Sequence, residues 1–187
     1  MRTTGKNHRD RLAKAALDLS YRRGFGNSAL SDIATAAGIP LGNLYYYFKT
    51  KDAIGGAILE LRLSRLERLL TQFDQLASPG DRLCAFVDVK IKNREALARL
   101  GCPVGTLCSE LHKSGSPVAK QATWLFDRAL CWMEKQFAAI GHKDEARGLA
   151  LHLLSATQGV SLLAHAFHDP GLIMIESERL KKWIRSL

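Results

Sequence analysis

The sequence lacks any apolar run long enough to cross a membrane, although 47% of its 187 residues are hydrophobic. A membrane-spanning helix needs about 20 predominantly apolar residues in succession, so we expect no membrane partner. The first residues, MRTTGKNHRDRLAKAA, are polar and basic and lack the apolar core of a secretory signal. We therefore expect a cytoplasmic, globular protein.

Cysteine is scarce, and acidic residues are outnumbered by basic ones. The four cysteines are scattered through a chain without an export signal, which argues against a disulfide framework. Lys and Arg total 27 against 18 Asp and Glu, and the first 52 residues hold nine of the former and four of the latter. This basic start indicates an anionic partner such as nucleic acid, the alternative being a solvated basic surface.

Strand-like alternation is also absent, and helical periodicity runs through nearly the whole chain. The pattern predicts about nine helices, at residues 9–23, 27–37, 41–48, 51–77, 81–100, 106–113, 118–140, 144–167 and 173–186. We expect an all-α fold. A compact three-helix domain at residues 1–52 is followed by a larger helical domain at residues 53–187.

Local signals mark the ends of the first helices. Gly24 and Gly38 are suited to end the first and second helices. Asn27 or Ser28 is expected to cap the second, and Thr50 the fourth. A helix, a glycine turn and a short helix form the helix-turn-helix pattern, which lays its second helix in the major groove of DNA.

The short third helix, LGNLYYYF, has two different faces. Leu44 and Phe48 are four residues apart and share one face, so we expect both to be buried. Asn43 lies off that face and is the best candidate for reading a base edge, since an amide pairs well with adenine. Of the tyrosines at 45–47, the first borders the buried face, and it either packs at the rim or bonds phosphate. The other two are expected to face the groove.

The stretch SALSDIATAAGIPLGNLYYYFKTKDAI resembles the DNA-binding signature of the tetracycline-repressor (TetR) family of bacterial transcriptional regulators. That signature has a hydroxyl residue before the second helix, an IA-x-x-AG core and turn, and G-x-LYxHF-x-SK through the recognition helix. The resemblance covers residues 11–59, about a quarter of the chain. It implies a homodimer that binds a palindromic double-stranded operator, usually as a repressor, and releases it when a small-molecule effector binds.

The resemblance also implies which residues contact DNA: Ser28, Ser31, Leu41, Gly42, Asn43, Tyr45, Tyr46, Tyr47 and Lys51. The two serines would touch phosphate, and residues 41–43 would face the bases. Tyr47 departs from the family, which often has histidine there, although a phenol can still donate to phosphate. Further nonspecific phosphate contacts are expected from Lys6, Arg9, Arg11 and Lys49, unless these are merely exposed cations.

The second domain must sense the effector and form the dimer. The segment LALHLLSATQGVSLLAHAF is apolar on more than one face, so we expect the last two helices to form the dimer interface, the alternative being a core helix. The candidate effector-binding residues are Phe86, Cys102, Trp124, Phe126 and Met133. Ordinary core packing is the alternative for the aromatic side chains.

The stretch GCPVGTLCSEL resembles a GCLxxxLxxE stretch in a subset of the family. Some of that subset respond to electrophiles or oxidants through this cysteine, which implies that Cys102 is a sensor and that Cys108 could resolve its sulfenic acid. The alternative is a buried, inert thiol. Cys108 and His112 have metal-ligand spacing, but two ligands are too few, so we expect no metal and no cofactor.

Two other classes of function compete with a regulator. An enzyme could use a Cys–His pair, but the sequence has no nucleophile motif and no glycine-rich phosphate loop. A structural DNA-compacting protein would bind without sequence preference, whereas Gly42 and Asn43 at the start of the third helix favour base readout. We therefore expect a regulator that is not an enzyme.

Overall fold

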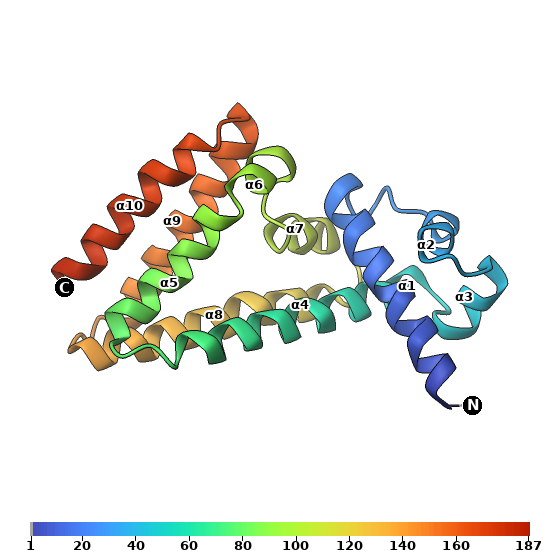
Figure 1. Ribbon diagram of the computed structural model, residues 1–187, viewed down its shortest axis with the longest axis horizontal. Helices are drawn as coiled ribbons and strands as arrows, with labels where there is room; N and C mark the ends of the chain where they lie inside the picture. Colours follow the sequence, from blue (N-terminus) through green and yellow to red (C-terminus); the bar gives the residue numbers. More distant parts are fainter. Residues whose placement is uncertain (1) are drawn as a thin grey trace. The chain divides into compact units, whose positions relative to one another are not determined.

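The computed structural model describes the backbone of residues 2–187 and the side chains from residue 7 onward. All regular structure in this part is helical, which confirms the predicted fold class. The helices are α1 (Arg2–Arg23), α2 (Leu30–Ala37), α3 (Leu41–Tyr47), α4 (Lys51–Phe73), α5 (Pro79–Lys92), α6 (Arg94–Leu100), α7 (Gly105–Lys113), α8 (Ala119–Ile140), α9 (Ala146–Phe167) and α10 (Gly171–Ser186) (Figure 1).

The chain forms two compact units, each built from two segments. Unit 1 comprises Met1–Ser64 and Thr106–Leu125, and unit 2 comprises Arg65–Gly105 and Phe126–Leu187. Helices α4 and α8 each run from one unit into the other without a break. The boundary between the units therefore falls within these two helices.

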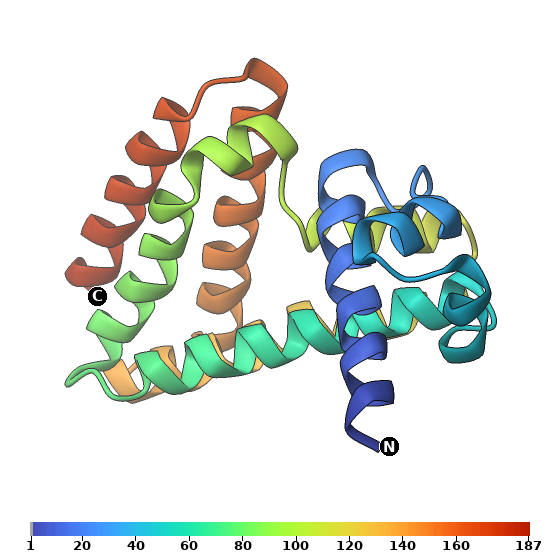
Figure 2. The ribbon, with the colours of Figure 1, turned by 45° about the vertical axis from the view of Figure 1, so that its right-hand side comes forward.

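The first three helices of unit 1 pack around a small core. Helix α1 packs against α2 and α3, and α2 packs against α3, as the dark-blue to cyan ribbons in Figure 2 show. Leu12, Ile33, Leu44 and Phe48 from these helices are all at most 2% exposed. Gly38 ends α2 in the left-handed conformation (φ 61°), which an L side chain adopts only with strain. The predicted glycine turn is confirmed.

One of the predicted N-caps is wrong and another is confirmed. Helix α2 begins at Leu30 with no side-chain cap. Ser28 Oγ donates instead to the Gly24 carbonyl (2.8 Å) and Asn27 Nδ2 to the Arg23 carbonyl (3.1 Å), so both satisfy the end of α1. Thr50 Oγ1 accepts the Ala53 N–H (3.1 Å), which is the predicted cap of α4.

The predicted helix at residues 81–100 is divided into α5 and α6. Asn93 has a non-helical backbone (φ −109°, ψ 13°), and its Nδ2 donates to the Val89 carbonyl at 2.7 Å. This local bond competes with the helical hydrogen-bond ladder, as asparagine side chains commonly do. At the other end of α5, Ser78 Oγ accepts the Asp81 N–H (3.0 Å), and Pro79 occupies the first turn.

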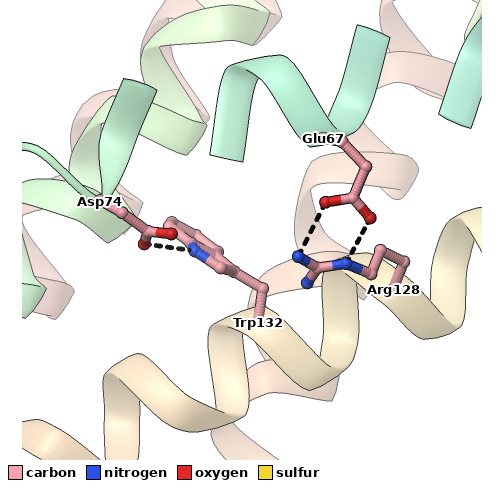
Figure 3. A network of polar contacts seen from close by, with 4 residues as sticks. All are labelled: Glu67, Asp74, Arg128 and Trp132. Atoms are coloured by element: carbon pink, nitrogen blue, oxygen red, sulfur yellow. Dashed lines mark hydrogen bonds and ion pairs between the residues drawn. The ribbon is translucent and has the colours of Figure 1, made fainter. Parts of the chain in front are cut away.

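Unit 2 is organised around a continuous apolar core. Leu83, Met133, Phe137 and Leu153, from α5, α8 and α9, are all 0% exposed. Helix α10 packs along both α5 and α9 (Figure 1). At the edge of the unit, polar contacts join the end of α4 to α8, as Figure 3 shows.

Helix α9 has two apolar faces. It is long and apolar enough to cross a membrane by length and composition, with a mean hydropathy of 1.2 over 18 residues, of which 39% are buried. Its inner face enters the core of unit 2, where Ala150 and Leu153 are 0% exposed, whereas Leu162 and Phe167 are 67% and 69% exposed. A core helix that also carries an outer apolar face passes the same membrane test, so α9 fits a helix with two packing partners.

Candidate nucleic-acid interface

Helix α3 divides into a buried face and an exposed face. Leu44 is 0% exposed and Phe48, directly after the helix, is 2% exposed, as predicted. In the first turn Leu41 is 40% exposed, and Gly42 and Asn43 are both exposed. The first turn of α3 is therefore open to a partner.

The tyrosines lie on the outer part of α3 in graded exposure. Tyr46 is 76% exposed and Tyr45 is 46% exposed, while Tyr47 is only partly exposed. The Tyr47 ring meets the edges of two others, Tyr46 at 5.0 Å and His8 of α1 at 6.3 Å between centroids. Tyr47 therefore packs against Tyr46, and Tyr46 is the most exposed of the three tyrosines.

Glycine at position 42 is not required by packing within the chain. A Cβ added there would meet no heavy atom within 4 Å, and its φ is not in the left-handed region. Glycine in a helix costs about 0.5–1 kcal/mol relative to alanine. No close contact within the protein explains this cost at Gly42, which is consistent with the close approach of a partner to the backbone there.

The two serines differ in accessibility. Ser31 lies exposed in the first turn of α2, where a hydroxyl can reach a phosphate. Ser28 is 1% exposed, and its hydroxyl already donates to the Gly24 carbonyl. The expectation that Ser28 touches phosphate is therefore wrong, because a buried side chain with a satisfied donor cannot reach DNA.

Several basic side chains of unit 1 are engaged within the protein. Lys51 Nζ donates to the Gly26 carbonyl (2.6 Å) and lies 5.3 Å from the centre of the Phe25 ring. Arg11 Nη2 donates to the Ala37 carbonyl at 2.6 Å and so holds the end of α2; Arg11 is exposed, and its phosphate contact stays a prediction.

The remaining cations have simpler surroundings. Arg9 pairs with Glu60 at 3.5 Å and lies over the Phe48 ring at 5.3 Å. Lys49 is exposed. The side chain of Lys6 lies outside the described residues. Lysines and arginines so placed add general affinity for phosphate and no base specificity.

The candidate effector-binding residues do not gather in one place. Met133 is 0% exposed within the core of unit 2, and Phe86 and Phe126 pack against that core. Trp124 belongs to unit 1 and is 59% exposed. Three of the five candidates therefore share one cluster, and Trp124 stands apart from it.

All four cysteines are free thiols. Cys102 is partly buried, and its Sγ accepts the N–H of Gly105, the first residue of α7, at 3.4 Å. Burial raises the pKa of the Cys108 thiol, which lies 3.7 Å from His112 Nδ1. Within the described part of the chain no three His, Cys, Asp or Glu side chains come together in a way that could hold a metal ion.

Sequence reasoning missed two features of unit 1. The Glu110 carboxylate accepts the Gly26 N–H at 2.7 Å. The sequence carries no local signal for this pairing, because it depends on how α7 packs against the turn. The other feature is the close packing at Gly55 and Gly56 in α4, which two adjacent glycines inside a helix could have indicated.

A glycine turn between two short helices, with the second helix open to solvent in a basic unit, defines a helix-turn-helix DNA-binding protein. The family described as "Bacterial regulatory proteins, tetR family" matches residues 12–58. The chain is also 30% identical over 162 residues to the HTH-type transcriptional repressor DhaR of Mycobacterium sp. (strain GP1), covering 82% of this chain and 80% of DhaR. The protein belongs to the TetR family of transcriptional regulators.

Solved structures share this fold over nearly the whole length of the chain. A TetR transcriptional regulator from Chloroflexus aurantiacus aligns with a TM-score of 0.84 at 21% identity, covering 99% of this chain and 97% of that one. The reduced form of Escherichia coli NemR aligns with a TM-score of 0.79 at 20% identity, covering 94% and 96%. At such identities the likeness establishes the shared fold alone.

Proposed function

We propose that the protein is a cytoplasmic, effector-responsive repressor that binds a palindromic operator as a homodimer. Residues 1–52 bind DNA, and residues 53–187 bind the effector and form the dimer. The observation that carries this proposal is the exposed first turn of α3, with Gly42 and Asn43 presented in front of the buried Leu44. The repressor name of DhaR supports the direction of regulation.

We assign base readout to Asn43. We assign phosphate contact to the other predicted DNA-contacting residues, without the buried Ser28. That set is Ser31, Tyr45, Tyr46, Tyr47 and Lys51, with Leu41 and Gly42 beside the bases. An amide paired bidentately with adenine contributes about 1–3 kcal/mol of discrimination. Specificity should therefore concentrate at one residue, whereas phosphate affinity is spread over several.

An operator selected from a random duplex pool with the wild-type protein provides the test. Asn43→Ala should weaken binding to the selected duplex by about 1–3 kcal/mol and leave binding to a scrambled duplex nearly unchanged. Gln75→Ala, an exposed amide of unit 2, is the matched control. Equal losses on both duplexes would support a structural DNA-compacting protein instead.

The dimer interface is assigned to the outer faces of α9 and α10. Leu162, Phe167 and Ile175 are 67%, 69% and 60% exposed. A shallow groove between the two helices is lined by Ala156, Gly159, Val160, Leu163, Leu172, Ile175, Glu176 and Arg179. Clustered apolar side chains of this kind mark an interaction surface, and a two-fold dimer is the commonest assembly.

Sedimentation of charged variants tests this interface. Leu162→Asp should convert the dimer to monomer at micromolar concentration, because a carboxylate would be buried without a partner. Leu76→Asp places the same charge at another exposed leucine (39%), outside α9 and α10, and should remain dimeric. A dimeric Leu162→Asp protein would move the interface elsewhere.

The effector site is assigned to the region of Phe86, Phe126 and Met133, with Trp124 the weakest member of the predicted set. A reactive electrophile acting at Cys102 is a second possible signal, favoured by the Gly105 N–H that points at its sulfur and by the existence of a reduced form of NemR. The Cys102 sulfur would add to a ring carbon of a quinone. The thiol proton would end on one quinone oxygen and the hydrogen of that ring carbon on the other, giving a hydroquinone thioether. Condensation with Cys108 is less favoured, because burial raises the pKa of that thiol.

Quinone treatment of the operator-bound protein tests the cysteine. Wild type and Cys131→Ser, which removes an exposed thiol, should release DNA, whereas Cys102→Ser should stay bound. If Cys102→Ser releases DNA at the wild-type rate, Cys102 is not the sensor and serves only to accept the Gly105 N–H.

A further inference from the structure

The segment that contains α7 and the start of α8 packs with the DNA-binding helices. Thr106–Leu125 falls in the same compact unit as Met1–Ser64, although the two are far apart in sequence. Helix α7 lies beside the C-terminal end of α1 (Figure 1). Its residue Glu110 bonds the Gly26 amide, just after α1. The question is what this segment holds in place.

Glu110 contacts the turn between α1 and α2. Its Oε2 accepts the Gly26 N–H at 2.7 Å, and its Oε1 lies only 3.1 Å from where a Cβ on Gly24 would stand. Gly24 ends α1 with a φ of 85°. A carboxylate that accepts a backbone N–H makes a charge-assisted bond, which is stronger than a neutral one. The turn is therefore fixed by α7 at the point where the chain changes direction.

The same turn is also held from α4. The Gly26 carbonyl accepts from Lys51 Nζ at 2.6 Å, so the amide and carbonyl of one residue are bound by opposite charges from two helices. Ser116, in the middle of the α7–α8 connection, donates from Oγ to the Asp52 carboxylate. Asp52 lies in the first turn of α4. The segment 106–125 thus contacts both the α1–α2 turn and the start of α4.

Close packing supports these polar contacts. A Cβ on Gly55 of α4 would lie 3.3 Å from Val118 Cγ2 and 3.2 Å from Phe25 Cζ. A Cβ on Gly56 would lie 3.8 Å from Gln121 Oε1. Small residues allow α8 to approach α4 here, so the segment has little freedom to shift without disturbing the turn.

We propose that Glu110 is a positioning residue for operator binding. By bonding the Gly26 amide it fixes the α1–α2 turn against α7, and so sets how α2 and α3 are presented to DNA. This inference rests on the proposed operator binding, which the Asn43 experiment tests separately.

Two substitutions of Glu110 in the full-length protein separate the hydrogen bond from general stability. E110A should weaken binding to the selected operator by about tenfold, since it removes the charge-assisted hydrogen bond that orients the exposed Gly26 amide. E110Q retains an acceptor oxygen and should stay within about threefold of wild type. Glu95→Ala, which removes an exposed acid of unit 2, should bind like wild type.

Amide hydrogen exchange provides a readout that does not depend on DNA. The Gly26 amide should exchange faster in E110A than in wild type and nearly normally in E110Q. Wild-type affinity and wild-type Gly26 protection in E110A would overturn the proposal, as would equal losses in E110A and E110Q. If the Asn43 experiment fails and Gly26 still loses protection in E110A, the proposed function is wrong and the role of Glu110 in the turn stands.

Helical circular dichroism shows whether E110A folds. If E110A does not fold, Ser116→Ala provides a second test of the proposal. This variant removes the contact to Asp52 and the longer bond that Ser116 Oγ accepts from the Val118 N–H (3.4 Å), and it leaves Glu110 in place. It should weaken operator binding by about threefold with normal helical content. Unchanged operator affinity in a folded Ser116→Ala protein would contradict the proposal that residues 106–125 position the DNA-binding helices.

Discussion

Both compact units bury apolar side chains, but in unit 1 polar contacts gather at the turns beside the DNA-binding helices. In unit 1, charged side chains bind backbone groups at the ends of helices: Glu110 and Lys51 bind Gly26, and Arg11 binds Ala37. Unit 2 depends on a continuous apolar core, with Met133 and Phe137 both 0% exposed. Apolar burial is non-directional, whereas a hydrogen bond fixes an orientation.

This difference suits the two tasks. Presenting α3 to DNA requires a defined helix direction, which directional contacts at turns can supply. Holding a large helical domain together requires mainly the removal of apolar area from water, at about 25 cal/mol per Å². Substitutions of the turn contacts in unit 1 should therefore change operator affinity more than stability, and those in the core of unit 2 should do the reverse.

The largest expected effect comes from emptying the core of unit 2. Phe137→Ala should lower the free energy of unfolding by about 3–5 kcal/mol, because it removes a ring that is 0% exposed and leaves a cavity. Urea denaturation at fixed protein concentration measures it, since unfolding of a dimer depends on concentration. The folded fraction should still bind the operator at low temperature with nearly wild-type affinity.

Leu44→Ala is the matched substitution in unit 1. Leu44 is also 0% exposed, so a loss of stability of about 2–5 kcal/mol is expected. This variant should also lose operator affinity in its folded state, because Leu44 seats α3. Equal operator affinities for folded Leu44→Ala and folded Phe137→Ala would contradict the division of tasks between the units.

The local structure of unit 1 was predictable from sequence because its signals act over a few residues. The spacing of Leu44 and Phe48 predicted the buried face of α3, and Gly38 and Thr50 marked helix ends correctly. Ser28 shows the limit of such signals. Its hydroxyl can cap α2 or bond back to α1, and only the packing of the turn selects the second.

Longer-range choices were not predictable from sequence. Nothing in the pattern around Glu110 indicates that its partner is Gly26, because that pairing depends on how α7 packs against the turn. The aromatic residues of α8 likewise look alike in sequence. Trp132 is 3% exposed whereas Trp124 is 59% exposed, so the stripe mixes core with surface.

An intermediate loss of DNA affinity is expected from Lys51→Ala, since Lys51 belongs to the polar contacts of unit 1. Lys51→Ala should weaken binding to operator and scrambled duplexes alike, by about tenfold, and flatten the salt dependence of binding by about one unit. It also frees the Gly26 carbonyl, so protection of the α1–α2 turn should fall. The neighbouring Lys49, which is exposed, provides the control: Lys49→Ala should change the salt slope without affecting the turn. A Lys51→Ala protein with wild-type salt slope would mean that this ammonium serves Gly26 alone.

The smallest effect is expected from the polar contacts of unit 2 drawn in Figure 3. Arg128 donates from Nε and Nη2 to the two carboxylate oxygens of Glu67, at 2.6 and 2.9 Å, but the two side chains are 36% and 42% exposed. Solvent screening limits a pair so exposed, and a double-mutant cycle of Glu67→Gln and Arg128→Gln should give a coupling energy of about 0.2–1 kcal/mol that shrinks in salt. Operator affinity should be unchanged in all three variants. A coupling well above this range, or a loss of operator affinity, would show that directional contacts matter in unit 2 as they do in unit 1.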